Sequence, residues 1–251
     1  MIFFKELGLG IGHYALAIRF IKEHHLWYWM VIPCILNLCA FVLVGVVSYV
    51  YTGDLLNYTL TSIGIEGDSW WTVTLQFIIS FIARVIIVLL YLKLFRYIVL
   101  IFFAPMLAFI SDKIQEISTG RKKPFTIGQF TTDVIRGITI AIKNLFMEVV
   151  LTSCILLISV TVPILAIVAP FIIYAVESYY FGFAMLDYRN EFMMINAKES
   201  RMLINRHKGL AFGIGGMFNL MLFVPFLGVL FAPVIAVVAG GLAFNKVDSP
   251  S

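Results

Sequence analysis

Long uninterrupted apolar stretches dominate the pattern of hydrophobic and polar positions along the chain. Four blocks stand out, at residues 26–51, 70–110, 145–186 and 210–244. The first has no formally charged residue and would make about 39 Å of helix, which is enough to cross the roughly 30 Å hydrocarbon layer of a bilayer. We therefore expect an all-α integral membrane protein whose first span is 26–51.

The second block, 70–110, is too long for one crossing because a continuous helix of that length would measure about 61 Å. Arg84, Lys93 and Arg96 interrupt it, and Pro105 stands near its end. We expect a long membrane helix that begins at residue 70 and then leaves the bilayer or lies along it. Proline lacks the amide hydrogen, so Pro105 is expected to kink or end the helix.

The charges between the blocks predict which side of the membrane each connection faces. Residues 52–69 contain three acidic residues and no Lys or Arg, whereas the basic residues gather before residue 26, in 113–143, in 189–208 and at Lys246. By the positive-inside rule these four basic regions share the cytoplasmic side. The third and fourth blocks, 145–186 and 210–244, therefore begin and end on one side and must turn back. With about 17 to 21 residues per arm, against roughly 20 for a full span, we expect half-penetrating hairpins.

Paired prolines mark the expected turns of both hairpins. Val-Pro and Ala-Pro steps occur in the third block at Pro163 and Pro170, and again in the fourth block at Pro225 and Pro233, as an internal repeat offset by about 62 residues. Proline disfavours helix at the preceding residue and fits the first helical position, so each Val-Pro is expected to end an arm and each Ala-Pro to start the next. Paired broken segments of this kind point to a translocation site, at which the new helix amino termini can attract an anion. The alternative is that the turns are simply packed protein.

Two connecting segments have the pattern of amphipathic helices at the membrane surface. One is the amino-terminal segment 1–25, whose apolar stripe consists of Ile11, Tyr14, Ile18 and Ile21. The other is 126–143, where Thr126 and Gln129 have the spacing of a helix capping box. The whole chain, 1–251, is thus expected to form a single membrane domain.

Composition excludes a soluble globular protein. Of the 251 residues 61% are hydrophobic and 13% charged, and the mean hydropathy is +0.99, whereas soluble domains are about a quarter charged. The net charge of +4 resides in the connections, which favours membrane orientation over nucleic-acid binding. The His and Cys residues have no metal-ligand spacing and no nucleotide-binding motif is present, so we expect neither an enzyme nor a metal or cofactor.

Three ionisable residues within the apolar blocks are candidates for an anion path, because a charge at bilayer depth is costly to insert. Arg84 stands roughly 21 Å along a helix from Trp70, and Glu148 and Glu177 stand at the outer ends of the two arms of the third block. Arg84 is expected to face a polar cavity and attract anions, tuned by one of the glutamates. The alternative is a structural Arg-Glu pair between helices.

Several short strings resemble a known family when taken in order. They are IPCILN at 32–37, FFAP at 102–105, LDY at 186–188 and RHKGLAFGIG at 206–215. The chain resembles the CysZ family of sulfate permeases and the wider EI24 membrane family over nearly its whole length. The resemblance implies a bacterial inner-membrane protein with two long membrane helices and two half-penetrating hairpins, which forms homo-oligomers and passes sulfate inward for cysteine synthesis.

The chain departs from this family just before the first long helix. Sulfate-transporting members resemble one another in a Gly-Leu-Arg-type loop there, whereas this chain has His25, Leu26 and Trp27. His24 and His25 can supply positive charge when protonated, or they can anchor the helix at the membrane interface. The expected function is a permease or channel for a small oxyanion, most naturally sulfate. The alternatives are a non-transporting membrane scaffold or remodelling protein, and a channel for another small solute.

Overall fold

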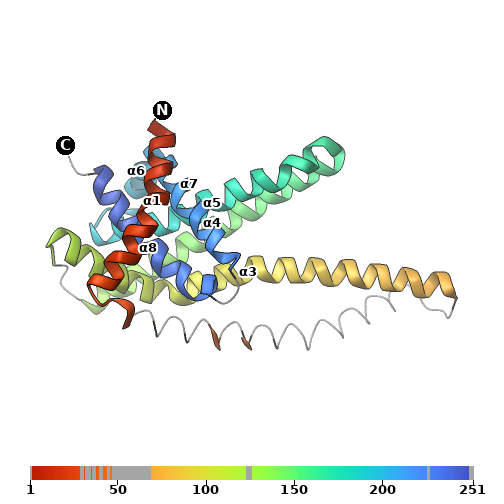
Figure 1. Cartoon of the computed structure of the whole chain (residues 1–251), viewed down its shortest axis with the longest axis horizontal. Coiled ribbons are helices and arrows are strands. Elements are labelled where there is room, and N and C mark those ends of the chain that lie inside the picture. Colours follow the sequence, from red (N-terminus) through yellow and green to blue (C-terminus); the bar gives the residue numbers. More distant parts are fainter. Residues whose placement is uncertain are drawn as a thin grey trace. The chain divides into compact units, whose positions relative to one another are not determined.

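The structure is a computed structural model that describes residues 2–28, 31, 35, 38, 39, 42, 43, 46, 69–122, 126–224 and 227–248. Regular structure in these residues is entirely helical, as expected for an all-α protein. Figure 1 shows the helices α1 (Ile2–Glu23), α3 (Trp70–Thr119), α4 (Ile127–Thr161), α5 (Pro163–Phe192), α6 (Ala197–Arg206), α7 (Lys208–Leu222) and α8 (Leu227–Asp248).

The chain divides into two compact units. One contains residues 1–35 and 100–251, and the other contains 36–99. In the smaller unit the described positions of the predicted first span are helical and expose apolar side chains, such as Leu43 and Val46. Trp70 and Trp71 at the start of α3 are exposed as well. The other residues of the predicted span 26–51, apart from those described above, lie outside the described part of the chain.

Within the part of the chain that the structure describes, three helices are long and apolar enough to cross a membrane. They are Ile127–Ser159, Ile164–Phe192 and Phe231–Asp248. About a fifth of the first two windows is buried in the protein, at 22% and 17%, whereas 67% of the third is buried. The protein is therefore a multi-pass membrane protein by helix length and composition, and the first two helices have apolar surface left for lipid.

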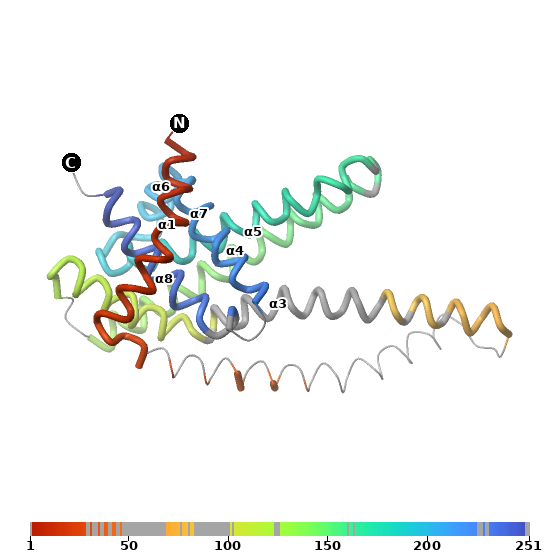
Figure 2. Tube along the Cα trace, in the orientation of Figure 1, coloured from red at the N-terminus to blue at the C-terminus, as the bar shows by residue number. Residues whose placement is uncertain are grey.

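Helices α4 and α5 form a hairpin (Figures 1 and 2) whose turn falls at the first Val-Pro step. Val162 leaves the helical conformation at φ −126° and ψ 90°, and Pro163 stands at the start of α5. The prediction that this Val-Pro step ends an arm is confirmed. The prediction that Pro170 starts the next arm is wrong, because Pro163 already occupies the starting position and Pro170 lies inside α5.

The second hairpin differs from the prediction in the same way. Helix α7 ends at Leu222 and α8 begins at Leu227, so Pro233 lies inside α8 and does not open it. Pro225 lies outside the described residues. One proline within a long helix costs a backbone hydrogen bond, a loss that membrane helices tolerate when neighbouring groups satisfy the freed carbonyl.

The predicted surface helix 126–143 is not a separate element. It continues without a break into the first arm of the hairpin, so that α4 has 35 residues and α5 has 30. The predicted arms were about 17 to 21 residues long, and the length argument for half penetration therefore does not hold for this hairpin. The depth to which it enters the bilayer stays a prediction.

Helix α7 lies at the centre of the larger unit, and its glycines allow backbones to meet there. A Cβ added at Gly215 would overlap the carbonyl oxygen of Ser178 in α5, and one added at Gly182 in α5 would overlap that of Ala211. On another side of α7, Gly209 and Gly213 meet backbone carbonyls of α1 in the same way. Small residues at helix contacts are typical of membrane bundles, where close backbone packing replaces the hydrophobic driving force.

Helix α1 packs against α7 and α8. Of its predicted apolar stripe, Tyr14 and Ile21 are buried, whereas Ile11 and Ile18 are exposed. The buried face of α1 includes Gly10 and Ala17 instead, and the small Gly10 lets α1 approach the backbone of α7. The Tyr14 hydroxyl donates to the carbonyl of Ile214 at 2.6 Å, and burial raises the pKa of Tyr14 well above its ordinary value, so it remains a neutral donor.

Candidate functional site: a polar network at the base of the hairpin

A continuous set of hydrogen-bonded side chains joins five helices at the end of the hairpin opposite its turn. We call it the base network. It runs from α4 through α5, α6 and α8 to α3, and consists of Arg136, Asp187, Ser200, Asn190, Arg189, Asn245, Asp248 and Gln115. Buried polar groups are costly unless they are hydrogen-bonded, so such a network fixes the relative positions of the helices that supply it.

An ion pair between Arg136 and Asp187 begins the network. The guanidinium holds the carboxylate through both oxygens, with Nε at 3.1 Å from Oδ2 and Nη2 at 2.8 Å from Oδ1. Arg136 also donates to the carbonyl of Ile195, and the hydroxyl of Ser200 donates to Asp187. The Asp187 side chain is 4% exposed. Two-point geometry in a dry environment makes this pair stronger than a surface ion pair.

Arg189, two residues after Asp187 on α5, forms the second half of the network. Its Nε donates to Asn245 at 2.9 Å, its Nη1 to Asn190 at 3.2 Å and its Nη2 to Asp248 at 2.7 Å. The guanidinium also lies over the ring of Phe244, with 5.1 Å from Cζ to the ring centroid. A guanidinium has five N–H donors, and the structure describes partners for three of them.

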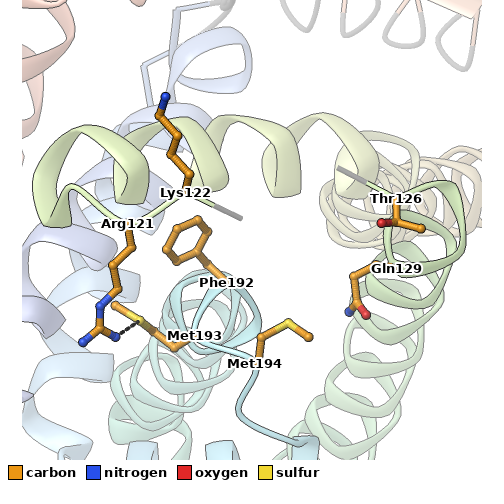
Figure 3. Close-up of a pocket in the computed structure, with 7 residues that line it drawn as sticks. All are labelled: Arg121, Lys122, Thr126, Gln129, Phe192, Met193 and Met194. Atoms are coloured by element: carbon orange, nitrogen blue, oxygen red, sulfur yellow. Dashed lines mark hydrogen bonds between the residues drawn. The ribbon is translucent and has the colours of Figure 1, made fainter. Parts of the chain in front are cut away.

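Two neighbouring cavities near the base network share Arg121 and Met193 in their walls. The smaller, of about 340 Å³, is lined by Arg121, Lys122, Thr126, Gln129, Phe192, Met193 and Met194. Figure 3 shows that the Lys122 side chain points away from Phe192, while the Arg121 guanidinium turns toward Met193. This cavity therefore has a largely apolar floor and little positive charge directed into it.

The second cavity is larger, about 740 Å³, and more polar. Ser118, Thr119 and Arg121 from the end of α3 and the segment after it form one part of its wall, and Arg189, Asn245 and Asp248 form another. Met193, Ile195 and Leu242 complete it. We call it the Arg189 cavity. Its described lining carries two guanidinium groups and one carboxylate, so an anion is the ligand that its charge favours.

The start of α4 beside the smaller cavity differs from the predicted capping box. Thr126 is the residue before the helix, as predicted, but its side chain makes no capping hydrogen bond. Gln129 donates instead to Asp133 Oδ1 at 2.7 Å. The Gln129 side chain thus bonds Asp133, one turn further into the helix. In a capping box it would instead turn back toward the backbone of Thr126.

The glutamates predicted for an anion path lie on the two arms of the hairpin. Glu148 is fully buried and Glu177 is half-buried. Asn144 on α4 donates to the carbonyl of Tyr180 on α5 at 3.1 Å. In that antiparallel register Glu148 and Glu177 stand at about the same level of the hairpin, each roughly four turns from Val162.

The cationic candidates lie on or directly after other helices, α3 and α1. Arg84 lies on α3, and its side chain is outside what the structure describes. His24 and His25 are exposed at the end of α1, where the His24 ring packs on Phe20 and His25 has a positive φ of 53°. A different histidine, His207, connects the start of α7 to α1, because its Nδ1 lies 2.7 Å from Oε1 of Glu6.

The base network escaped sequence reasoning because its members are far apart in the chain. Asp187 lies 51 residues from Arg136, and Arg189 lies 59 from Asp248. One signal was present: directly after the third apolar block, charged residues occur at every second position, at Asp187, Arg189 and Glu191. Charges so close to an apolar run need partners when the helix continues through them, as α5 does.

Apolar helices long enough to span a bilayer, arranged with a buried ionic network at their polar end, define a helical membrane protein with an anion-favouring cavity. A family model described as "Sulfate transporter CysZ/Etoposide-induced protein 2.4" matches residues 14–233. The chain therefore belongs to the CysZ/EI24 family, as its short strings predicted. The comparison with curated proteins gave no match.

Proposed function

We propose that this protein is a passive or weakly coupled path for a small oxyanion, with sulfate as the substrate. Membership of the CysZ/EI24 family over residues 14–233 is the observation that carries the proposal. The positive charge of the Arg189 cavity supports it, since its described lining has one carboxylate against two guanidinium groups. We place the protein in a bacterial inner membrane, as a homo-oligomer that supplies sulfate for cysteine synthesis.

The path would pass the ionisable residues of the long helices. Arg84 on α3 would offset part of the dehydration cost of the anion, as arginine does in anion-selective pores. Burial of Glu148 supports a role for a glutamate in tuning this path. The alternative for Arg84 remains a structural pair with a glutamate of a neighbouring helix. His24 and His25 would attract anions to the surface when protonated, or serve only as interfacial anchors.

Flux of radiolabelled sulfate into proteoliposomes tests the proposal. We expect uptake above that of protein-free vesicles, and we expect Arg84→Ala to reduce it. Lys198→Ala, at an exposed position of α6, is the control for loss of one positive charge. Uptake equal to that of empty vesicles would exclude the permease, and unchanged uptake by Arg84→Ala would remove that residue from the path.

A membrane scaffold or remodelling role is the second candidate, and one feature favours it specifically. The side chains around the hairpin turn are apolar and highly exposed, with Leu157 at 69%, Ile167 at 73% and Phe171 at 74%. Such a segment can act as a wedge in one leaflet. A wedge requires no anion, so vesicle deformation that is independent of sulfate, together with absent flux, would favour this role.

A further inference from the structure

The wall of the Arg189 cavity contains one removable negative charge. Its two cations are Arg121 and Arg189, and Asp248 is the one acidic residue in its described lining. With Asp248 in place the formal charge of these groups is about +1, and without it about +2. The second value is the complement of a divalent oxyanion.

Arg189 is held in place independently of Asp248. Its side chain is 6% exposed, and Asn245 and Asn190 fix two of its three nitrogens. The ring of Phe244 supports the face of the guanidinium. A guanidinium positioned in advance loses little freedom when it binds a ligand, which favours affinity.

Asp248 is held much less firmly than Arg189. Its side chain is 35% exposed, and it is the last residue of α8 as the structure describes this helix. Its described partner is Nη2 of Arg189, at 2.7 Å. The partly exposed carboxylate of Asp248 loses little when it is released to water. The bound anion then replaces it as the counter-charge of the buried Arg189 guanidinium, so that this charge is not left unpaired.

We propose that the Arg189 cavity binds a tetrahedral divalent oxyanion of the sulfate or phosphate type, and that the anion displaces the carboxylate of Asp248. The choice of ligand class rests on the proposed function. Arg189 binds the anion from a fixed position, and Arg121 faces it from the segment after α3. Ser118, Thr119 and Asn245 line the same cavity, where the Thr119 hydroxyl and the Asn245 amide already donate to Gln115.

The size of the cavity fits a hydrated ion. At about 740 Å³ it exceeds many times the roughly 30 Å³ that one water molecule occupies in the liquid, so the anion can keep part of its water shell. When anion is scarce, Asp248 pairs with Arg189 and neutralises it. The end of α8 therefore acts as a built-in competitor that weakens anion binding and sets the concentration at which the cavity fills.

Calorimetric titration of the purified full chain in detergent with inorganic sulfate tests this proposal. Asp248→Asn is expected to lower the Kd about fivefold, the effect of losing one weak competing ion pair. Glu199→Gln makes the same change of charge at an exposed position of α6 and is expected to leave the Kd unchanged. Equal changes of the Kd in the two variants would contradict competition between Asp248 and the anion for Arg189.

The cation is tested at Arg121, because that side chain is exposed and its loss does not threaten folding. Arg121→Gln is expected to raise the Kd for sulfate about fivefold, whereas Arg206→Gln, at an exposed position of α6, is expected to leave it unchanged. Arg189→Lys keeps the charge but loses the planar donor set, and is expected to weaken binding further. Unchanged binding in both Arg121→Gln and Arg189→Lys would overturn the site.

Parallel titrations identify the anion and separate this proposal from the proposed function. Phosphate at a pH where it is divalent is expected to compete with sulfate, and chloride is not. Binding of a soluble short-chain phosphatidic acid without binding of the inorganic ions would overturn the free-ion form of the proposal. Sulfate binding with the expected variant effects but without vesicle flux would overturn the permease alone, and flux without those effects would overturn this cavity alone.

Discussion

The two ends of the α4–α5 hairpin share the same helices but meet opposite surroundings. At the hairpin tip, residues 151–172, there is no charged residue, and most of the apolar side chains are exposed. At the hairpin base, residues 127–144 and 178–192, Arg136, Asp187 and Arg189 are held in a buried network. The tip is built to meet lipid, whereas the base is built to meet other helices.

This difference shows where the specificity of the fold resides. Exposed apolar side chains at the tip need only be apolar, since lipid adapts to their shape. At the base each polar group needs a partner in a definite position, because an unpaired buried charge is costly. Substitutions at the base should therefore have larger effects than those at the tip, and the effects should depend on geometry.

The largest effect is expected where the base packs most closely on α7. In Gly182→Leu the new side chain would overlap the backbone of Ala211, and the helices must separate at a cost of roughly 3 kcal/mol or more. Size-exclusion chromatography in detergent should show loss of the monodisperse peak. Gly128→Leu, at a helical glycine with open space around it, is the control. Equal, normal behaviour of both variants would show that α5 and α7 are not packed in this way.

The next largest effect is expected in the base network. Asp187→Asn leaves Arg136 with a buried and uncompensated charge, which should lower the free energy of unfolding by about 3 kcal/mol. Glu23→Gln breaks the pair between Glu23 and Arg19, whose side chains are 52% and 76% exposed, and should change the free energy of unfolding far less, because water screens such a pair. Denaturant titration in mixed micelles compares the two. Similar losses in both would contradict a buried ion pair.

A charge placed at the hairpin tip tests the lipid side of the comparison. Ile167 is 73% exposed, and Ile167→Asp should destabilise the protein in lipid nanodiscs by about 2.5 to 3.5 kcal/mol if it lies deep in the bilayer. Met194→Asp, at a position that is 64% exposed beside the base, should have an effect of less than about 0.5 kcal/mol. The midpoint of thermal unfolding in nanodiscs reports both. No difference between them would place the tip outside the hydrocarbon.

The smallest effect concerns α6, the helix that brings Ser200 into the network. The Asn196 side chain accepts from the amides of Lys198 and Glu199 at 3.1 and 2.9 Å. Asn196→Ala should therefore cost about 1 kcal/mol of unfolding free energy. Thr126→Ala at the start of α4 removes a side chain that makes no capping hydrogen bond, and should lower the free energy of unfolding by only a few tenths of the loss in Asn196→Ala. A larger loss from Thr126→Ala would reverse the assignment of the two caps.

Sequence reasoning predicted the tip better than the base for a physical reason. Lipid-facing segments are visible in short stretches of sequence, as apolar runs and as the proline after Val162. The position of the turn and the all-helical fold class could therefore be predicted. Apart from the adjacent Asn190, the described hydrogen-bond partners of Arg189 lie on α8, 56 and 59 residues further along the chain, and no periodicity relates them to Arg189. The first helical position taken by Pro163 was also missed, because a proline can either end a helix or begin one, and the choice depends on the neighbouring helices.

The candidate site shows the same division. Arg84, Glu148 and Glu177 attracted attention because a charge in an apolar run is conspicuous in one dimension. Arg121 and Asp248, by contrast, stand in ordinary polar segments and become notable only where the fold brings them beside Arg189. A cavity is a property of several segments together, and sequence alone gives no measure of it.

Depth measurements with spin labels test the contrast between tip and base most directly. With the three native cysteines replaced by alanine, single labels at Ile167→Cys and Met194→Cys can be compared in nanodiscs for collisions with oxygen and with a water-soluble nickel chelate. We predict that the label at 167 is accessible to oxygen and shielded from nickel, and that the label at 194 is accessible to nickel. Strong nickel access at 167 would contradict a lipid-embedded tip.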